Sequence, residues 1–144
     1  MGFVAKLEIK PTHIIMNAGL WPHKNLLGTL KSALFAAKHI TPNVYWKETS
    51  PNKACLTNKN SFQKRNLNCP RDIDDLARYY CGLTQQLCKY VEFPKKIPSY
   101  LLNDEKLPEY FDKVHFSSPE LYVFWSKILL KRMDLDYLSK ALDL

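Results

Sequence analysis

Apolar and polar positions in the first third of the chain predict a strand, a helix and a second strand. An apolar run within residues 12–21 ends in Asn17 and Gly19 and is typical of a short buried strand. Apolar residues then recur at helical spacing up to Pro42, in a stripe made of Leu26, Leu27, Leu30, Ala33, Leu34, Ala37 and Ile40. A further strand follows at residues 44–46. This order predicts a βαβ unit, and therefore a parallel sheet with a right-handed crossover.

The second half of the chain predicts two longer helices and one more strand. Asp72 is in the cap position of a helix over residues 72–90, whose core-facing stripe holds Ile73, Leu76, Ala77, Tyr80 and Leu87. Residues 89–93 read as a strand, and a proline-rich loop follows over 94–108. Ser118 and Pro119 begin the last sizeable helix, with an apolar stripe of Leu121, Tyr122, Phe124, Trp125, Ile128 and Leu129. A short final helical turn is predicted from Leu135, Leu138 and Leu142.

Composition narrows the class of protein. The chain has 144 residues, of which 46% are hydrophobic and 12% aromatic, and this indicates one globular domain over residues 1–144 with a modest core. No apolar run approaches the length of a membrane span. The apolar stretch at the start of the chain is also too short and too interrupted by charged residues for a secretory signal.

Positive charge is concentrated in the middle of the chain. The net charge is +7, and residues 50–71 contain no acid but hold Lys53, Lys59, Lys64, Arg65 and Arg71. Such a segment attracts an acidic polysaccharide, a nucleic acid or an anionic lipid, or it is simply a solvated loop. Phe62 is the only aromatic residue in this segment, so base stacking is not indicated and no specific nucleic-acid recognition is expected.

The four cysteines, at positions 55, 69, 81 and 88, show no Cys-x-x-Cys spacing, so neither a zinc site nor any other metal or cofactor is predicted. In a helix over 72–90, Cys81 and Cys88 would lie about 10 Å apart, too far to bond each other. A disulfide would then join Cys55 to Cys69, or either of these to a helix cysteine, and would cross-link the long loop that precedes this helix. The alternative is that Cys81 and Cys88 are reduced core residues.

The pattern with most chemical content places Asp112 three residues before His115, directly ahead of a helix start. A carboxylate that binds the Nδ1 hydrogen of histidine fixes its tautomer and leaves Nε2 free to accept a proton. A tight turn can satisfy this geometry locally. The same spacing also occurs in surface pairs without function, so other features must support a catalytic interpretation.

Further polar candidates follow the predicted strands. Ligands of parallel sheets bind beyond the carboxyl ends of the strands, and that is where the sequence places Asn17, Gly19, Trp21, Thr49 and Ser50. His23 is nearby and is either a contact for a substrate hydroxyl or an exposed loop residue. Trp21 and Trp46 offer flat faces for a sugar ring, although burial in the core is the expected role of Trp46.

In order and spacing, three segments resemble the SGNH or GDSL hydrolases, and within them the PC-esterase and trichome-birefringence-like O-acyl esterases and acyltransferases. These segments are residues 15–21, 44–51 and 112–115. The resemblance implies a partial three-layer α/β/α fold, with a short parallel sheet formed by strands three, four and five of the family order 2-1-3-4-5. It also implies that Asn17 donates to an oxyanion, that His115 is the base for a serine, and that Asp112 orients His115. The implied substrate is a carbohydrate or another acylated hydroxyl compound.

The chain departs from this family at the nucleophile. No Gly-Asp-Ser turn is present; Ser117 and Ser118 resemble helix caps, and Ser50 is interpreted as a turn serine before Pro51. We therefore expect no hydrolysis by this chain alone, since the base and oxyanion donor have no hydroxyl to act on. A carboxy-terminal fragment, a mispredicted start and a degenerate paralogue remain open. A non-catalytic protein that holds an anionic glycan or a protein partner through the basic segment is the alternative.

The family's strand order has a structural implication. The strand that contains Ile14, Ile15 and Met16 would lose its neighbour, which leaves a hydrophobic edge open to a partner strand or to the missing amino-terminal segment. We therefore expect marginal stability unless that edge is covered. For a full-length parent protein, the resemblance implies the secretory pathway, the Golgi or the extracellular space.

Overall fold

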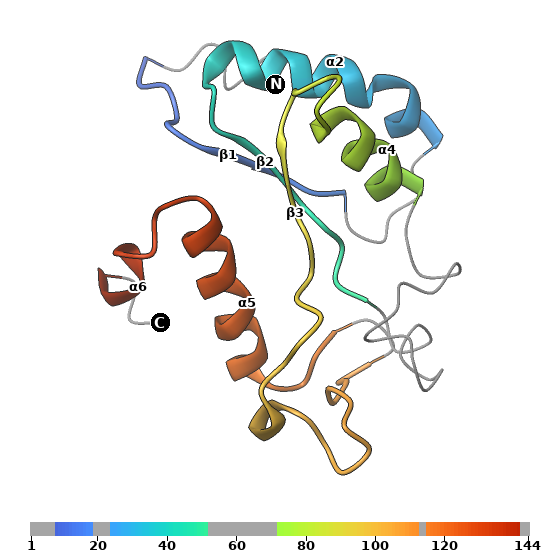
Figure 1. The fold of residues 1–144 in the computed structure, drawn as a ribbon, viewed down its shortest axis with the longest axis vertical. Helices are drawn as coiled ribbons and strands as arrows, with labels where there is room; N and C mark the ends of the chain where they lie inside the picture. The colour runs from blue at the N-terminus through green and yellow to red at the C-terminus, as the bar shows by residue number, and fades with distance from the viewer. Residues whose placement is uncertain (1–7, 19–23, 52–71, 113–114, 142–144) are drawn as a thin grey trace. The chain divides into compact units, whose positions relative to one another are not determined.

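The computed structural model describes residues 8–18, 24–51, 72–112 and 115–141 (Figure 1). The elements are β1 (Ile14–Met16), α2 (Lys24–Ile40), β2 (Val44–Lys47), α4 (Asp72–Cys81), β3 (Lys89–Val91), the 3-10 helix η1 (Ser99–Leu101), α5 (Pro119–Arg132) and α6 (Leu138–Ala141). The chain forms two compact units, a first unit of residues 1–49 and 71–92 and a second unit of residues 50–70 and 93–144. Helices combined with a parallel sheet place the protein in the α/β class, as predicted.

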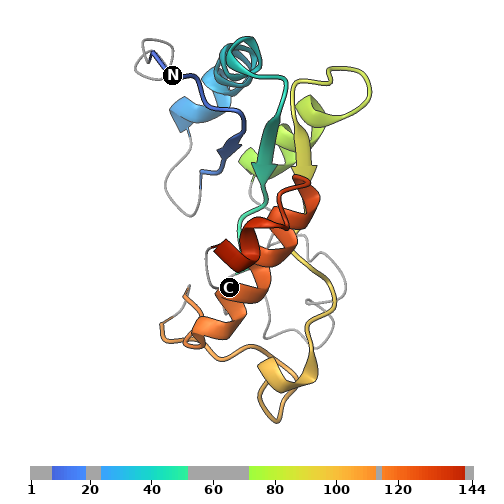
Figure 2. The same cartoon turned by 90° about the vertical axis from the view of Figure 1, so that its left-hand side faces the viewer.

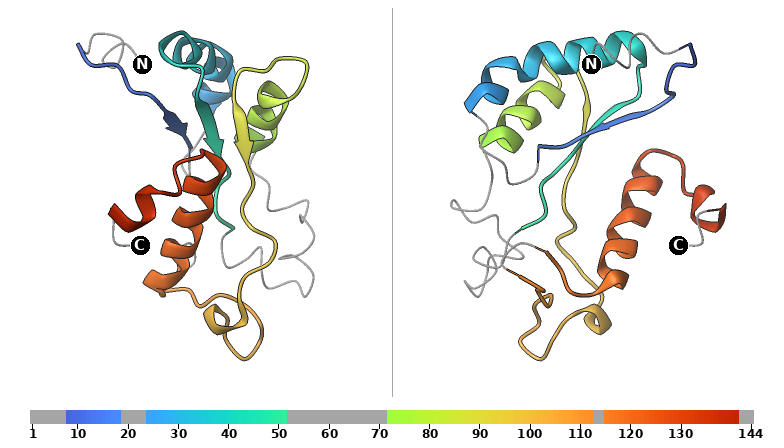
Figure 3. Two further views of the ribbon diagram at one scale, coloured as in Figure 1. Left: turned by 60° about the vertical axis from the view of Figure 1, so that its left-hand side comes forward. Right: turned by 180° about the vertical axis from the view of Figure 1, so that it is seen from behind.

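The sheet of the first unit has the order β1-β2-β3, and both strand pairs are parallel. Figure 2 shows the three strands side by side with the same direction. Helices α2 and α4 form the two crossovers, and right-handed crossovers that advance in one direction place both helices on the same face of the sheet. Figure 3 shows α2 and α4 next to each other in two further views.

The core of the first unit lies between that face and the two helices. Its buried members are Leu30, Leu34, Ala37, Val44, Trp46, Ile73, Ala77, Leu87 and Cys88. This confirms Leu30, Leu34 and Ala37 of the apolar stripe predicted for α2, and the packing role predicted for Trp46. The side chain of Leu26 lies outside the described residues. The first strand differs from the expectation of a buried strand, because the Ile15 side chain is 47% exposed.

Strand β1 lies at one end of the described sheet. The Ile14 amide donates to the Asn43 carbonyl oxygen at 2.9 Å, so Ile14 and Met16 direct their backbone groups toward β2. The backbone groups of Ile15 therefore point to the other side. Within the described residues, no strand pairs with that side.

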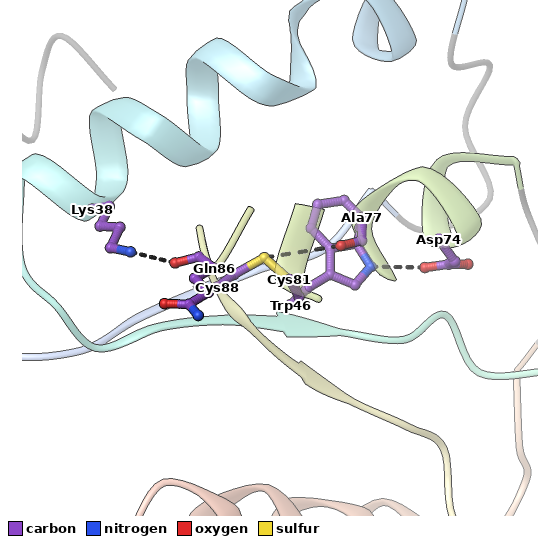
Figure 4. Close-up of a disulfide and its surroundings, with 7 residues drawn as sticks. All are labelled: Lys38, Trp46, Asp74, Ala77, Cys81, Gln86 and Cys88. Carbon is purple, nitrogen blue, oxygen red and sulfur yellow. Dashed lines mark hydrogen bonds between the residues drawn. A yellow bond between two sulfur atoms is a disulfide. The ribbon is translucent and has the colours of Figure 1, made fainter. Parts of the chain in front are cut away.

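Helix α4 is shorter than the sequence predicted, and this overturns the argument about its cysteines. The helix ends at Cys81, and the chain reverses through Gly82, where a Cβ atom would come within 3.1 Å of the Tyr79 carbonyl oxygen. The Leu87 amide then donates back to the Tyr80 carbonyl oxygen at 2.9 Å. The reversal brings Cys81 and Cys88 together in a disulfide with a Cα–Cα distance of 4.3 Å (Figure 4). The prediction that these two cysteines cannot bond each other was therefore wrong; Cys55 and Cys69 lie outside the described residues.

The second unit has an aromatic core. Phe93 packs between Phe116 and Trp125, with ring centroids 5.9 Å and 5.3 Å apart. Helix α5 buries Leu121, Trp125 and Leu129 from the predicted stripe and begins at Pro119, as predicted. The Ser118 hydroxyl, however, donates to the Glu120 carboxylate at 2.7 Å and makes no capping hydrogen bond with the backbone. Helix α6 confirms the predicted final turn. None of the described helices is long and apolar enough to cross a membrane.

Candidate functional site

A tight hairpin in the second unit carries the Asp112–His115 pair. Tyr110 and Phe116 form an antiparallel bridge. The Phe111 amide donates to the His115 carbonyl oxygen at 2.8 Å, and the Ser117 amide donates to the Glu109 carbonyl oxygen at 3.0 Å. The pairing of residues 109–111 with residues 115–117 therefore brings Asp112 and His115 close together.

Both oxygens of the Asp112 carboxylate contact His115. Oδ1 accepts the His115 backbone N–H at 2.7 Å, and Oδ2 lies 2.8 Å from the imidazole Nδ1. The side chains of His115 and Asp112 are 67% and 44% exposed. Within the described part of the chain, Nε2 makes no hydrogen bond. The contact predicted from the spacing is present, with the imidazole edge that would accept a proton open to solvent.

This arrangement can perform general-base chemistry. A carboxylate at Nδ1 selects the tautomer in which Nε2 is the acceptor, and it stabilises the imidazolium formed after proton transfer. The backbone hydrogen bond limits how far the carboxylate can rotate away. An exposed pair of this kind contributes at most about 1 kcal/mol to stability. The Asp112 carboxylate also has a structural use, because it accepts a backbone N–H within the turn.

At the carboxyl ends of the strands in the first unit, Asn17 lies next to Thr49. The Asn17 amide nitrogen donates to the Lys47 carbonyl oxygen at 2.7 Å, and it lies 3.4 Å from the Thr49 hydroxyl. The second contact is long for a hydrogen bond. The Asn17 amide nitrogen is therefore held by the Lys47 carbonyl oxygen and only weakly by Thr49. The structure brings these two predicted residues together.

Buried Asp74 is a polar residue that the sequence analysis missed. Its side chain is 1% exposed, and it accepts the Trp46 indole N–H at 2.9 Å (Figure 4). It also accepts the Thr49 backbone N–H at 3.3 Å. Burial lowers the pKa of the nearby Lys47 ammonium, and the Asp74 carboxylate opposes this shift. Asp74 thus ties α4 to the end of β2. The sequence offered no signal for it, because Asp72, Asp74 and Asp75 are equally typical of a helix start.

A second missed group joins β2, α4 and β3. The Glu48 carboxylate accepts the Tyr90 hydroxyl at 2.6 Å and pairs with Arg78 at 3.2 Å. Arg78 also pairs with Glu92 at 2.7 Å, and its guanidinium lies 4.2 Å from the centre of the Tyr90 ring. Burial, and then the Glu48 carboxylate, raise the pKa of the Tyr90 hydroxyl. Because its charges are paired with one another, we interpret this network as structural.

A groove of about 370 Å³ lies between η1 and the first turns of α5 in the second unit, within the size range of small-molecule sites. It is lined by Tyr100, Pro119, Glu120, Val123, Phe124 and Lys127. The Tyr100 side chain is 79% exposed at this groove. Because Pro119 follows His115 by four residues, their Cα atoms are at most about 15 Å apart.

Several predicted residues lie elsewhere. Gly19, Trp21 and His23, and the basic residues between positions 52 and 71, are outside the described residues. Ser50 is half-buried and begins the second unit. Asn17 and Thr49 belong to the first unit and the Asp112–His115 pair to the second, so the structure brings predicted residues together within each unit. The catalytic and binding roles of all these residues remain predictions.

No group of three or more His, Cys, Asp or Glu side chains suited to a metal ion occurs in the part of the chain that the structure describes. The chain was also compared with protein-family models, with curated proteins and with solved structures. None of these comparisons finds a match.

Proposed function

We propose that this chain is the carboxy-terminal part of an SGNH-type O-acyl ester hydrolase or acyltransferase, acting on acetyl or related esters of carbohydrate hydroxyls. The observation that carries the proposal is the two-point contact of the Asp112 carboxylate with His115. This contact is the local geometry that a serine's base requires. The resemblance of residues 15–21 and 44–51 to the family supports it.

In this proposal, each residue has a distinct role. His115 Nε2 removes the proton of a serine hydroxyl, and Asp112 stabilises the imidazolium that results. The weakly engaged amide hydrogen of Asn17 turns from Thr49 to the oxyanion of the tetrahedral intermediate. The 144 residues contain no Gly-Asp-Ser sequence, so the nucleophile comes from another polypeptide segment, and this chain alone does not turn over.

The groove at α5 gives the non-reacting part of the substrate a place to bind. The exposed Tyr100 ring offers a flat apolar face to a sugar ring, and Glu120 and Lys127 can hydrogen-bond to its hydroxyls. Gly19, Trp21, His23, Thr49 and Ser50 are proposed as further substrate contacts, because they follow the carboxyl ends of the strands.

The test adds a segment with a nucleophilic serine to this chain. The chain is joined, ahead of Met1, to the strand–helix–strand block of an SGNH esterase that carries its Gly-Asp-Ser turn, and hydrolysis of an aryl acetate is measured. We expect turnover that His115→Ala lowers by about 100-fold or more. His39→Ala is the matched control, because His39 lies on α2 and its hydrogen bond among the described residues is to the Phe35 carbonyl oxygen of the same helix. Equal activity in the two variants would refute the proposal.

The alternative function is binding without catalysis. It is favoured by the basic segment, in which Lys53, Lys59, Lys64, Arg65 and Arg71 occur without an acid. A glycan or other polyanion held in this way is released by salt. Retention of the chain on a sulfated-polysaccharide column, lost on replacement of Lys64 and Arg65 by Ser, together with no turnover in the joined enzyme, would favour this function.

A further inference from the structure

Phe116, the neighbour of His115 in the hairpin, is held by two tyrosines. Its side chain is 4% exposed. The Tyr110 and Tyr122 rings lie 5.1 Å and 5.5 Å from the Phe116 ring, measured between centroids. We propose that the hydroxyls of Tyr122 and Tyr110 position the His115 imidazole for its contact with Asp112. The geometric part of this inference stands by itself, and its importance for catalysis rests on the proposed function.

Tyr122 fixes the backbone directly after His115. Its hydroxyl oxygen accepts the Phe116 backbone N–H at 2.8 Å. Tyr122 belongs to the first turns of α5, so this single bond connects the hairpin to a helix that buries Leu121 and Trp125 in the core. The side chain of Tyr122 is itself 39% exposed, and its aromatic ring alone would leave the Phe116 N–H without this acceptor.

Tyr110 fixes the opposite side of the hairpin. Its hydroxyl donates to the Pro51 carbonyl oxygen at 2.6 Å, so it connects the hairpin to Pro51. Burial, and to a smaller extent Tyr122, raise the pKa of the Tyr110 hydroxyl. The hydroxyl therefore remains a donor throughout the neutral range.

The need for this support follows from the exposure of the catalytic pair. The His115 side chain is 67% exposed and that of Asp112 is 44% exposed, so water competes for both partners of their contact. A short hairpin with a free end would let residues 112 and 115 separate by small backbone rotations. The hydrogen bonds of the Tyr110 hydroxyl and of the Phe116 backbone N–H limit those rotations, because each lies next to a paired residue of the hairpin.

Replacement of Tyr122 by Phe tests the inference, because it removes the acceptor oxygen and keeps the ring. The measurements are amide hydrogen exchange at Phe116 and the tautomer of His115, read from its ring ¹⁵N chemical shifts. We expect Phe116 exchange to accelerate by about fivefold or more, and the fraction of His115 protonated at Nδ1 to fall. Tyr137→Phe is the matched control, since Tyr137 is 68% exposed and makes no hydrogen bond among the described residues.

Tyr110→Phe provides a second variant and should lower the Nδ1-protonated fraction of His115 in the same direction. If neither variant changes the His115 tautomer, the inference is overturned. It is also overturned if only Phe116 exchange responds, because Tyr122 would then act on stability alone. Failure of the proposed function looks different: the tautomer responds as expected, while His115→Ala leaves turnover of the joined enzyme unchanged.

Discussion

His115 presents its backbone N–H and its imidazole Nδ1 to one carboxylate, that of Asp112, at 2.7 Å and 2.8 Å. The two contacts use different oxygens of the carboxylate, so the turn and the ring orientation depend on the same side chain. Because the partners are only three residues apart, both contacts lie within one turn of the chain. Their effects on chemistry and on stability can therefore be separated.

Replacement of Asp112 by Ala should change the free energy of unfolding by no more than about 1 kcal/mol, since the His115 and Asp112 side chains are 67% and 44% exposed. The same change should shift the His115 tautomer, because no carboxylate then binds the Nδ1 hydrogen. Urea unfolding and ring ¹⁵N spectra measure the two effects. A loss of stability well above 2 kcal/mol, with an unchanged tautomer, would identify Asp112 as a purely structural residue.

Replacement of Asp74 by Ala should lower the free energy of unfolding by about 3 kcal/mol, because it leaves the Trp46 indole N–H buried without an acceptor. Asp74→Asn keeps an oxygen acceptor and should cost less. Asp72→Ala is the control, since Asp72 lies in the same first turn but is exposed. Similar losses for Asp74→Ala and Asp72→Ala in urea unfolding would contradict the role given to Asp74.

Replacement of both Cys81 and Cys88 by Ala should lower the free energy of unfolding by roughly 2 kcal/mol, the value expected for closing a loop of this length. A reducing agent should destabilise the parent chain by a similar amount through this bond. A chain with Cys55 and Cys69 replaced by Ala isolates the effect, because it retains only the two bonded cysteines. If that chain shows free thiols under oxidising conditions, Cys81 and Cys88 do not form this bond.

Two tyrosines should make the free energy of unfolding fall at alkaline pH. The pKa values of the Tyr90 and Tyr110 hydroxyls are raised in the folded chain above the ordinary value of about 10. Their contribution to stability is thus fully present below that pH and is lost as pH rises above it, because the unfolded chain then releases protons that the folded chain retains. In a titration of phenolate absorbance, Tyr90 and Tyr110 should ionise only on unfolding. The prediction is contradicted if the parent chain shows a phenolate signal below the pH of unfolding that the Tyr90→Phe variant does not show.

The sequence predicted elements that depend on local periodicity. Helices α2 and α5 follow stripes of Leu, Ala and aromatic residues bounded by Pro42 and Pro119, and the contact of Asp112 with His115 follows from their spacing. Local patterns of this kind need little tertiary information.

The sequence did not predict features that depend on tertiary contacts. The sequence predicts that the apolar stripe of α4 continues to Leu87, but Leu87 is buried by a chain reversal after Gly82 and not by helical periodicity. That reversal also decides the disulfide partner of Cys81. Likewise, Asp74 became a buried acceptor only because the Trp46 indole comes from a different element.

Trp46 and Trp125 are buried in different units, Trp46 at 2% exposure in the first and Trp125 at 3% in the second. Intrinsic fluorescence can therefore follow each half of the molecule through its own chromophore, once the remaining indoles are replaced by Phe. Coincident melting curves from the two probes would show a single cooperative transition, whereas separate midpoints would show that the halves unfold independently.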